Sequence, residues 1–282
     1  MANIKLTLEY DGTDFHGFQR QPHLRTVQGE LEDRFSHLLG ESVKLIGAGR
    51  TDAGVHALGQ VVNFRTTRPV PVDRLADVLN GVLPEDVKVQ ACEEVDEGFH
   101  ARRCARSRLY RYTAIERPRP SPVLGRFALV VPDRLDIDEM SAAAAPLRGR
   151  HDFRAFQASG SEAKTTERNL LRLFCRRNGR RIEITAEADS FLYKMVRTMV
   201  GALLRVGRGE LRPERLADAL ATGQALPKCP PAPACGLCLV RVSYMSTAQK
   251  DVGQHGCRGL LDTVGGRGRA SGGGRDWRAD ES

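Results

Sequence analysis

In the first third of the chain, apolar residues follow two repeats in turn: every second position, as in a strand, and every third or fourth position, as in a helix. Residues 4–10 alternate strictly, as a half-buried strand does. After Thr26, which can cap a helix, apolar residues recur at helical spacing up to residue 39. The same reasoning predicts strands at 43–46, 60–65 and 87–91 and a helix at 73–83. The order β-α-β-β-α-β is that of the ferredoxin-like split motif.

The pattern beyond residue 105 predicts the same order of elements, with additions. Tyr110 and Tyr112 share one face of a strand at 108–115, and Asn178-Gly179 between two strand-like runs is a strong hairpin signal. The other predicted elements are strands at 127–131, 170–177, 181–188 and 238–244 and helices at 137–147, 191–206 and 213–221.

We therefore predict an α+β fold. Two ferredoxin-like βαββαβ halves, residues 1–104 and 105–246, would form one mostly antiparallel sheet with helices on one face and a central cleft. Residues 247–282 are rich in glycine and arginine and poor in apolar side chains. We expect this tail to be disordered, either as a plain extension or as a weak RNA contact.

Basic residues exceed acidic ones in this chain of 282 residues, with 43 Lys and Arg against 35 Asp and Glu and a net charge of +8. Arginine dominates the excess, and its guanidinium group binds phosphate bidentately, so nucleic acid is the leading candidate partner. The start of the chain lacks the apolar core of a secretory signal, and no run approaches the roughly 18 apolar residues of a membrane span. We expect a cytoplasmic protein that does not enter membranes.

Seven scattered cysteines argue against a disulfide framework in such a protein. Cys235 and Cys238, with Cys229 upstream, have part of the spacing of a zinc site. However, no histidine follows within 15 residues, and Cys238 opens a predicted strand. We therefore predict no metal.

The loop at residues 47–56 holds the main candidate for chemistry. Asp52 lies in a glycine-rich segment beside Arg50, with no second acid within ten residues. Such loops often present groups to a ligand, and this one lacks the spacing of a dinucleotide fingerprint or a P-loop. Asp52 is a candidate nucleophile or base, or alternatively a turn residue that binds backbone donors. His56 is either a base or a packed side chain.

Three other segments could contact an anionic substrate. The predicted helix at 191–206 has Arg197 at the border of its apolar stripe, where a partly buried arginine needs an anion such as Asp52. A basic stretch that includes Arg102 precedes Tyr110 and Tyr112, which suits a phosphate-lined groove with a stacking platform, or a basic surface over core tyrosines. The segment around Arg20 is either an RNA-facing loop or an ordinary turn.

These motifs together resemble the TruA family of tRNA pseudouridine synthases, over residues 3–245. The most specific string is Gly49-Arg50-Thr51-Asp52-Ala53-Gly54-Val55-His56. Other landmarks follow in the family's order: Gly17-Phe18-Gln19-Arg20-Gln21, Phe99-His100-Ala101-Arg102, Tyr110-Arg111-Tyr112, Phe191-Leu192-Tyr193-Lys194-Met195-Val196-Arg197 and Gly236-Leu237. The cysteine pair and the tail lie outside the family pattern.

The resemblance implies an isomerase that converts uridines 38 to 40 in the anticodon arm of tRNA to pseudouridine, as a homodimer without cofactor or metal. It implies that Asp52 is the catalytic aspartate, that Arg197 pairs with it, and that Tyr110 stacks on the uracil and is a candidate for proton abstraction. Arg50 would extrude the base and hold RNA, and Leu237 would line the pocket. Arg20 and Arg102 lie within family landmarks and are further candidates for substrate binding.

The target atom is unreachable inside a stack, so such an enzyme must extrude the base before an ionised carboxylate can act on it. Whether Asp52 attacks C1′, attacks the uracil ring or deprotonates the 2′ position stays open. The alternative function is a non-catalytic RNA-binding protein or RNA chaperone on the same scaffold.

Overall fold

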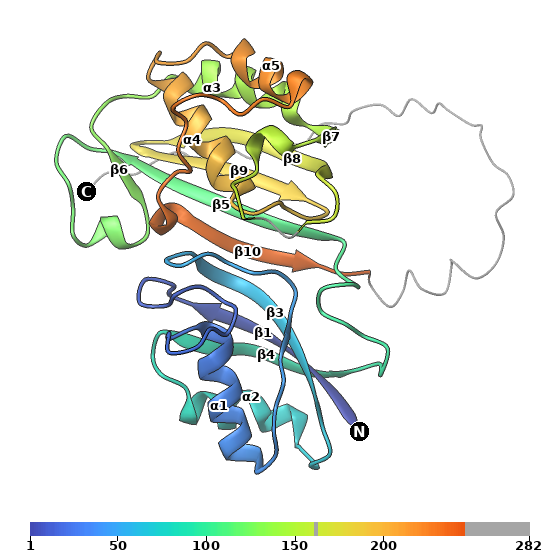
Figure 1. The fold of residues 1–282 in the computed structure, drawn as a ribbon. Coiled ribbons are helices and arrows are strands. Elements are labelled where there is room, and N and C mark those ends of the chain that lie inside the picture. Colours follow the sequence, from blue (N-terminus) through green and yellow to red (C-terminus); the bar gives the residue numbers. More distant parts are fainter. Residues whose placement is uncertain (161–162, 246–282) are drawn as a thin grey trace, which may run out of the picture. The chain divides into compact units, whose positions relative to one another are not determined.

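A ten-stranded sheet runs through the part of the chain that the computed structural model describes, residues 1–160 and 163–245 (Figure 1). Its main path is β4-β1-β3-β10-β5-β9-β8-β7, with β2 paired to β3 and β6 paired to β5. The pairs β3–β10 and β5–β6 are parallel, and the other pairs are antiparallel. The predicted α+β class with a mostly antiparallel sheet is confirmed. The predicted tail at 247–282 lies outside the described residues.

The first part of the sheet has the strand order β4-β1-β3-β2. Its elements are β1 (Ala2–Tyr10), α1 (Val27–Leu39), β2 (Ile46–Gly47), β3 (His56–Thr66), α2 (Val72–Val82) and β4 (Val87–Val95). The Thr26 side chain accepts a hydrogen bond from the Gly29 amide at 3.2 Å, so it caps α1 as predicted. Gly40 ends this helix with a φ of 64°, which glycine adopts without strain.

The second part repeats this order as β10-β5-β9-β8. Its elements are β5 (Ser107–Glu116), β6 (Leu129–Val131), α3 (Ile137–Ala144), β7 (Gly149–Asp152), β8 (Glu167–Asn178), β9 (Arg181–Ala188), α4 (Met195–Gly207), α5 (Glu214–Thr222) and β10 (Leu237–Ser243). Short 3₁₀ turns occur at Leu124–Arg126, Ala145–Leu147, Arg154–Phe156 and Ala234–Gly236. Residues 1–245 form one compact unit, and the boundary near residue 104 stays a prediction.

Three elements of the structure differ from the prediction. The strand expected at 43–46 is reduced to Ile46–Gly47, because the amides of Val43 and Leu45 donate to side chains of α1 instead of pairing with β3. The helix expected from 191 begins at Met195, because Lys194 adopts a left-handed conformation with a φ of 56°. The polar edge strand β7 was not predicted, because it has no alternating apolar pattern.

The helices cover the sheet and complete one hydrophobic core. Leu31 and Phe35 of α1 are fully buried, as are Met199 and Leu203 of α4, which packs against α3. Figure 1 shows α1 and α2 beside β1, β3 and β4, and α3, α4 and α5 beside the strands of the second part. Among the described residues, no helix combines the length and apolar character needed to cross a bilayer.

Candidate active site

The loop at residues 47–56, which joins β2 to β3, is held by the segment that follows β1. The Phe18 amide donates to the Thr51 carbonyl at 3.0 Å, and the Gly54 amide donates to the Phe15 carbonyl at 3.3 Å. Gly17 has a φ of 89°, and a β-carbon there would lie 2.9 Å from the Thr51 carbonyl oxygen. Both features require glycine, so this residue lets the two segments approach closely.

Buried side chains fix the residues just before Asp52. The Tyr10 hydroxyl lies 2.8 Å from the Thr51 hydroxyl, and the Gln60 amide donates to the Gly49 carbonyl at 2.8 Å. Burial raises the pKa of Tyr10 to about 12, so its phenol stays neutral at physiological pH and acts only as a hydrogen-bonding group. The loop is therefore anchored to β1 and β3 just before the catalytic candidate.

Asp52 and Arg197 form an ion pair between the two parts of the sheet. The Asp52 Oδ2 and Arg197 Nη1 atoms lie 2.8 Å apart, and their side chains are 21% and 15% exposed. Arg197 stands on the first turn of α4 and also donates from Nε to the Ala232 carbonyl at 2.7 Å. The guanidinium group is thus oriented by two acceptors, so it presents a fixed positive charge to the carboxylate.

The second acceptor depends on a close approach of the chain to α4. The Ala232 amide donates to the Arg197 carbonyl at 2.8 Å, which completes a reciprocal pair with the arginine side chain. One turn further along the helix, a β-carbon at Gly201 would overlap the Pro230 carbonyl. A glycine at this position therefore lets the segment before β10 lie against the helix and orient Arg197.

Tyr110 lies beside the ion pair with its ring mostly buried. Its strand β5 runs between β10 and β9, and the ring meets Phe191 edge-on, with centroids 5.3 Å apart. Burial raises the pKa of Tyr110 above its usual range, and the neighbouring Tyr10 and Asp52 raise it further. The phenol is therefore neutral at physiological pH.

Leu237 and Tyr112 extend the same face of the sheet. Leu237 is paired with Tyr112, and Leu239 with Tyr110, in the β10–β5 register. Leu237 is 5% exposed, while Tyr112 is fully buried beneath Gly236. The two tyrosines share a face as predicted, but only Tyr110 keeps any exposed surface, so Tyr112 is a core residue.

Arg108 is a positioning residue that the sequence analysis missed. It is 8% exposed, and its guanidinium group donates to four backbone carbonyls: Ala48 and Arg102 at 2.8 Å, Asp189 at 2.6 Å and Ala105 at 3.3 Å. It thereby ties the loop before Asp52 to the segment before α4. The sequence did contain a signal for this role, because Arg108 lies two residues before Tyr110 and therefore on the same, inward face of the strand.

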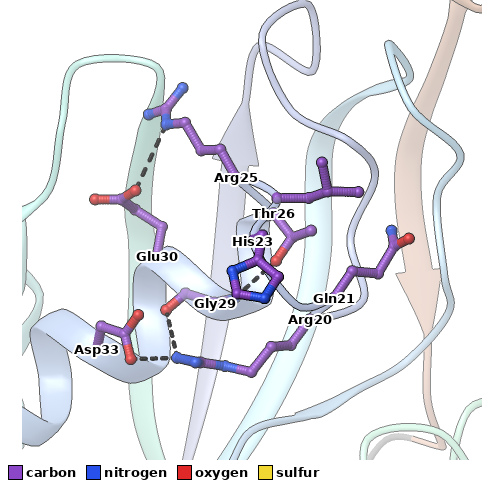
Figure 2. Close-up of a pocket in the computed structure, with 9 residues that line it drawn as sticks. Arg20, Gln21, His23, Arg25, Thr26, Gly29, Glu30 and Asp33 are labelled. Atoms are coloured by element: carbon purple, nitrogen blue, oxygen red, sulfur yellow. Dashed lines mark hydrogen bonds and ion pairs between the residues drawn. The ribbon is translucent and has the colours of Figure 1, made fainter.

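The predicted substrate-binding arginines lie in different surroundings. Arg50 and Arg102 are exposed, and the Arg102 carbonyl is one of the acceptors of Arg108. Arg20 borders a pocket at the start of α1 that Figure 2 shows, where it pairs with Glu32 at 3.0 Å and with Asp33. That pocket contains neither Asp52 nor Tyr110, and the charge of Arg20 is already matched by carboxylates.

His56 is packed into the structure at the start of β3. It is 6% exposed, its Nδ1 atom accepts a hydrogen bond from the Gly12 amide at 3.1 Å, and its ring lies against Phe127. Burial lowers the pKa of His56, and the nearby Asp11 carboxylate only partly opposes this shift. The geometry agrees with the packed interpretation of this histidine.

The three clustered cysteines have separate environments. The Cys229 sulfur accepts a hydrogen bond from Arg205 at 3.3 Å, and the Cys235 thiol lies 3.9 Å from the Ala128 carbonyl. Within residues 1–160 and 163–245, no three His, Cys, Asp or Glu side chains gather in a way that could hold a metal ion.

Comparison with known proteins matches the chain to one family. The family model described as tRNA pseudouridine synthase matches residues 7–102 and 143–245. A protein of Acetivibrio thermocellus named tRNA pseudouridine synthase A is 43% identical over 244 residues, which cover 86% of this chain and all of that protein. The protein of the same name from Moorella thermoacetica is 44% identical over 246 residues, with the same coverage.

A further relative, named tRNA pseudouridine synthase A 2, comes from Clostridium perfringens. It is 39% identical over 244 residues, again 86% of this chain and the whole of the relative. The loop with Asp52 and the helix with Arg197 lie inside the segments matched by the family model, whereas the strand with Tyr110 lies between those segments. The resemblance to the TruA proteins is thereby confirmed, and the chain belongs to the tRNA pseudouridine synthase family of isomerases.

Proposed function

We propose that this protein converts uridine to pseudouridine in tRNA, at one or more of positions 38, 39 and 40 of the anticodon arm. The relatives named tRNA pseudouridine synthase A support the reaction and the substrate class. The observation that carries the proposal is the 2.8 Å pair between Asp52 and Arg197, with the neutral Tyr110 beside it. These groups can hold an extruded base against a carboxylate.

The reaction breaks the bond between N1 and C1′ and forms a bond between C5 and C1′. A proton leaves C5 and another is gained at N1, so the reaction is an isomerisation without oxidation or reduction. Extruding the uridine costs a few kcal/mol, which stacking on the Tyr110 ring and phosphate contacts with arginines offset. Leu237 completes the apolar wall beside the ring.

Asp52 supplies the reactive carboxylate in this mechanism. Its ion pair with Arg197 orients the carboxylate, and an ionised carboxylate can act as a nucleophile or a base. Attack at C1′, attack on the ring and removal of the 2′ proton all need this ionised group. Tyr110 would contact the same base and is the candidate for the later removal of the C5 proton, a step in which its phenol must first give up its own proton.

The exposed Arg50 and Arg102 are the proposed contacts to the RNA near the target base. Arg50 lies two residues before Asp52, and the backbone carbonyl of Arg102 accepts a hydrogen bond from Arg108. We further propose that the protein acts in the cytoplasm, where its proposed substrate is found. We also propose that it is a homodimer, as the family resemblance implies. Sedimentation equilibrium at micromolar concentration would test the dimer directly.

The decisive experiment incubates the purified protein with unmodified tRNA transcripts and maps pseudouridine at single-nucleotide resolution. We expect new pseudouridine confined to positions 38–40, and none with the Asp52→Asn variant under the same conditions. Tight binding of tRNA without any pseudouridine would instead support the alternative of a non-catalytic RNA-binding protein. Pseudouridine at other positions would overturn the proposed specificity but not the reaction.

A further inference from the structure

A second concentration of arginines lies at the far end of β5 from Tyr110. Three segments meet there around a pocket: the end of β5 with the residues after it, the residues after β6, and the turn between β8 and β9. We call this the arginine pocket, and its lining residues are Glu116, Arg117, Pro118, Pro132, Arg134, Arg177, Gly179 and Arg180.

Backbone hydrogen bonds fix the walls of the arginine pocket. The Glu116 amide donates to the Arg180 carbonyl at 2.9 Å, and the Arg117 amide donates to the Val131 carbonyl at 2.8 Å. Gly179 turns the hairpin with a φ of 59°, as the Asn-Gly pair predicts. The three segments that carry the arginines are therefore joined to one another.

One ion pair forms the floor of the pocket. The Glu116 carboxylate accepts from the Leu135 amide at 2.7 Å through Oε1 and pairs with Arg177 through Oε2. Arg177 also donates to the Leu135 carbonyl, so both side chains are held. The single acid of the lining is thus neutralised by one of its four arginines.

The other three arginines carry charge that the described chain does not match. No hydrogen bond or ion pair joins the side chains of Arg117, Arg134 and Arg180 to another residue of the described segments. Arg20, by contrast, borders a pocket in which carboxylates already bind it. Three arginines that line one pocket without acceptors favour an anion with several oxygens, and phosphate fits the fork geometry of the guanidinium group.

The position of the pocket indicates where that phosphate would come from. Tyr110 and Glu116 are six residues apart on one strand, which corresponds to about 20 Å at the rise of a β-strand. A phosphate in the pocket would therefore belong to a nucleotide well away from a uridine at Tyr110. We propose that the arginine pocket binds backbone phosphates of the substrate tRNA, at nucleotides remote from the target uridine; this inference rests on the proposed function.

The test compares the Arg134→Gln/Arg180→Gln double variant with wild type and with Arg74→Gln. Arg74 is a matched control, since it is exposed on α2 and its side chain has no partner within the described residues. We expect the double variant to bind tRNA about 10-fold more weakly, with kcat within about two-fold of wild type. The slope of log affinity against log salt should become shallower by about 1 to 2, because fewer counterions are released.

The control should change affinity by less than about two-fold, and thermal unfolding should show that all three proteins are folded. Wild-type affinity and salt slope in the double variant would overturn the inference. The inference would also be overturned if the double variant lost binding of inorganic phosphate, measured by calorimetry, but kept wild-type affinity for tRNA. The pocket would then bind a free anion. A wild-type protein that binds tRNA but forms no pseudouridine would refute the proposed function, while the affinity and salt slope of the double variant would still test the pocket.

Discussion

The site around Asp52 and the arginine pocket are both rich in arginine, but they use this residue in opposite ways. At the first site, Arg197 is bound to a carboxylate and a carbonyl, and Arg108 is bound to four carbonyls. In the arginine pocket, Arg117, Arg134 and Arg180 have no acceptor in the described chain. Bonded arginines hold protein groups in place, whereas unbonded ones are available to a ligand. Substitutions should therefore affect chemistry at the first site and affinity at the second.

The largest effect is expected at Asp52 itself. Asp52→Asn keeps the shape of the side chain but removes the charge that the reaction needs, so turnover should fall by at least about 10⁴-fold. Affinity for tRNA should change little, because the arginines that contact phosphates are untouched. Measurable pseudouridine formation by the purified variant would contradict the catalytic role, and a filter-binding assay would check the affinity.

Substitution of the ion-pair partner should have the next largest effect. Arg197→Ala removes the charge beside Asp52 and should lower kcat by about 10²- to 10³-fold, in the range seen when one electrostatic partner is lost. Arg197→Lys keeps the charge but cannot reach both Asp52 and the Ala232 carbonyl with the same geometry, so we expect partial recovery. A wild-type rate for the alanine variant would exclude the pairing as part of the mechanism.

Arg108 tests whether a bonded arginine acts through positioning. Arg108→Lys should lower kcat by about 10-fold and leave KM for tRNA nearly unchanged, because the loop before Asp52 loses part of its anchor. Arg108→Met leaves four carbonyls without this donor and should lower the free energy of unfolding by about 2–4 kcal/mol.

The split between kcat and KM distinguishes positioning from substrate contact at Arg108. A rise in KM with unchanged kcat would place this arginine among the residues that touch RNA, and the contrast with the arginine pocket would disappear. Steady-state kinetics and chemical denaturation of the two variants provide both readouts.

The smallest effect concerns His56 and the pH dependence of stability. Burial lowers the pKa of His56 in the folded state, so the folded protein binds fewer protons there than the unfolded chain. The contribution of this residue to the free energy of unfolding is present above the pKa of about 6.5 that histidine has in the unfolded chain, and it is lost as the pH falls below that value. We expect the melting temperature to fall between pH 7.5 and 5.0, and to fall less in His56→Asn; equal slopes would refute this contribution.

Local patterns predicted most of the fold because burial of a strand or helix leaves a period in the sequence. The β1 alternation, the Thr26 cap and the Asn178-Gly179 turn were all predicted correctly. The errors occurred where a distant segment decides the outcome. The strand at 43–46 was predicted from its apolar residues, but the amides of Val43 and Leu45 donate to side chains of α1 instead of to β3.

The candidate site was predicted in the same uneven way. Asp52, Tyr110 and Arg197 were found from their loop, strand and helix and from the family resemblance, and the structure places all three together. Arg108 was grouped with phosphate-binding arginines, because a basic stretch does not reveal which member turns inward. Its four acceptors come from separate parts of the chain.

The sequence by itself was sufficient to predict most element types, the basic character and the candidate carboxylate Asp52, since these depend on neighbouring residues and on a specific local string. Only the tertiary structure decided which arginines are bound and which are available, because a guanidinium group finds its acceptors among residues far away in the chain. The arginine pocket is the clearest case, since it joins residues near positions 117, 134 and 180 that share no local pattern.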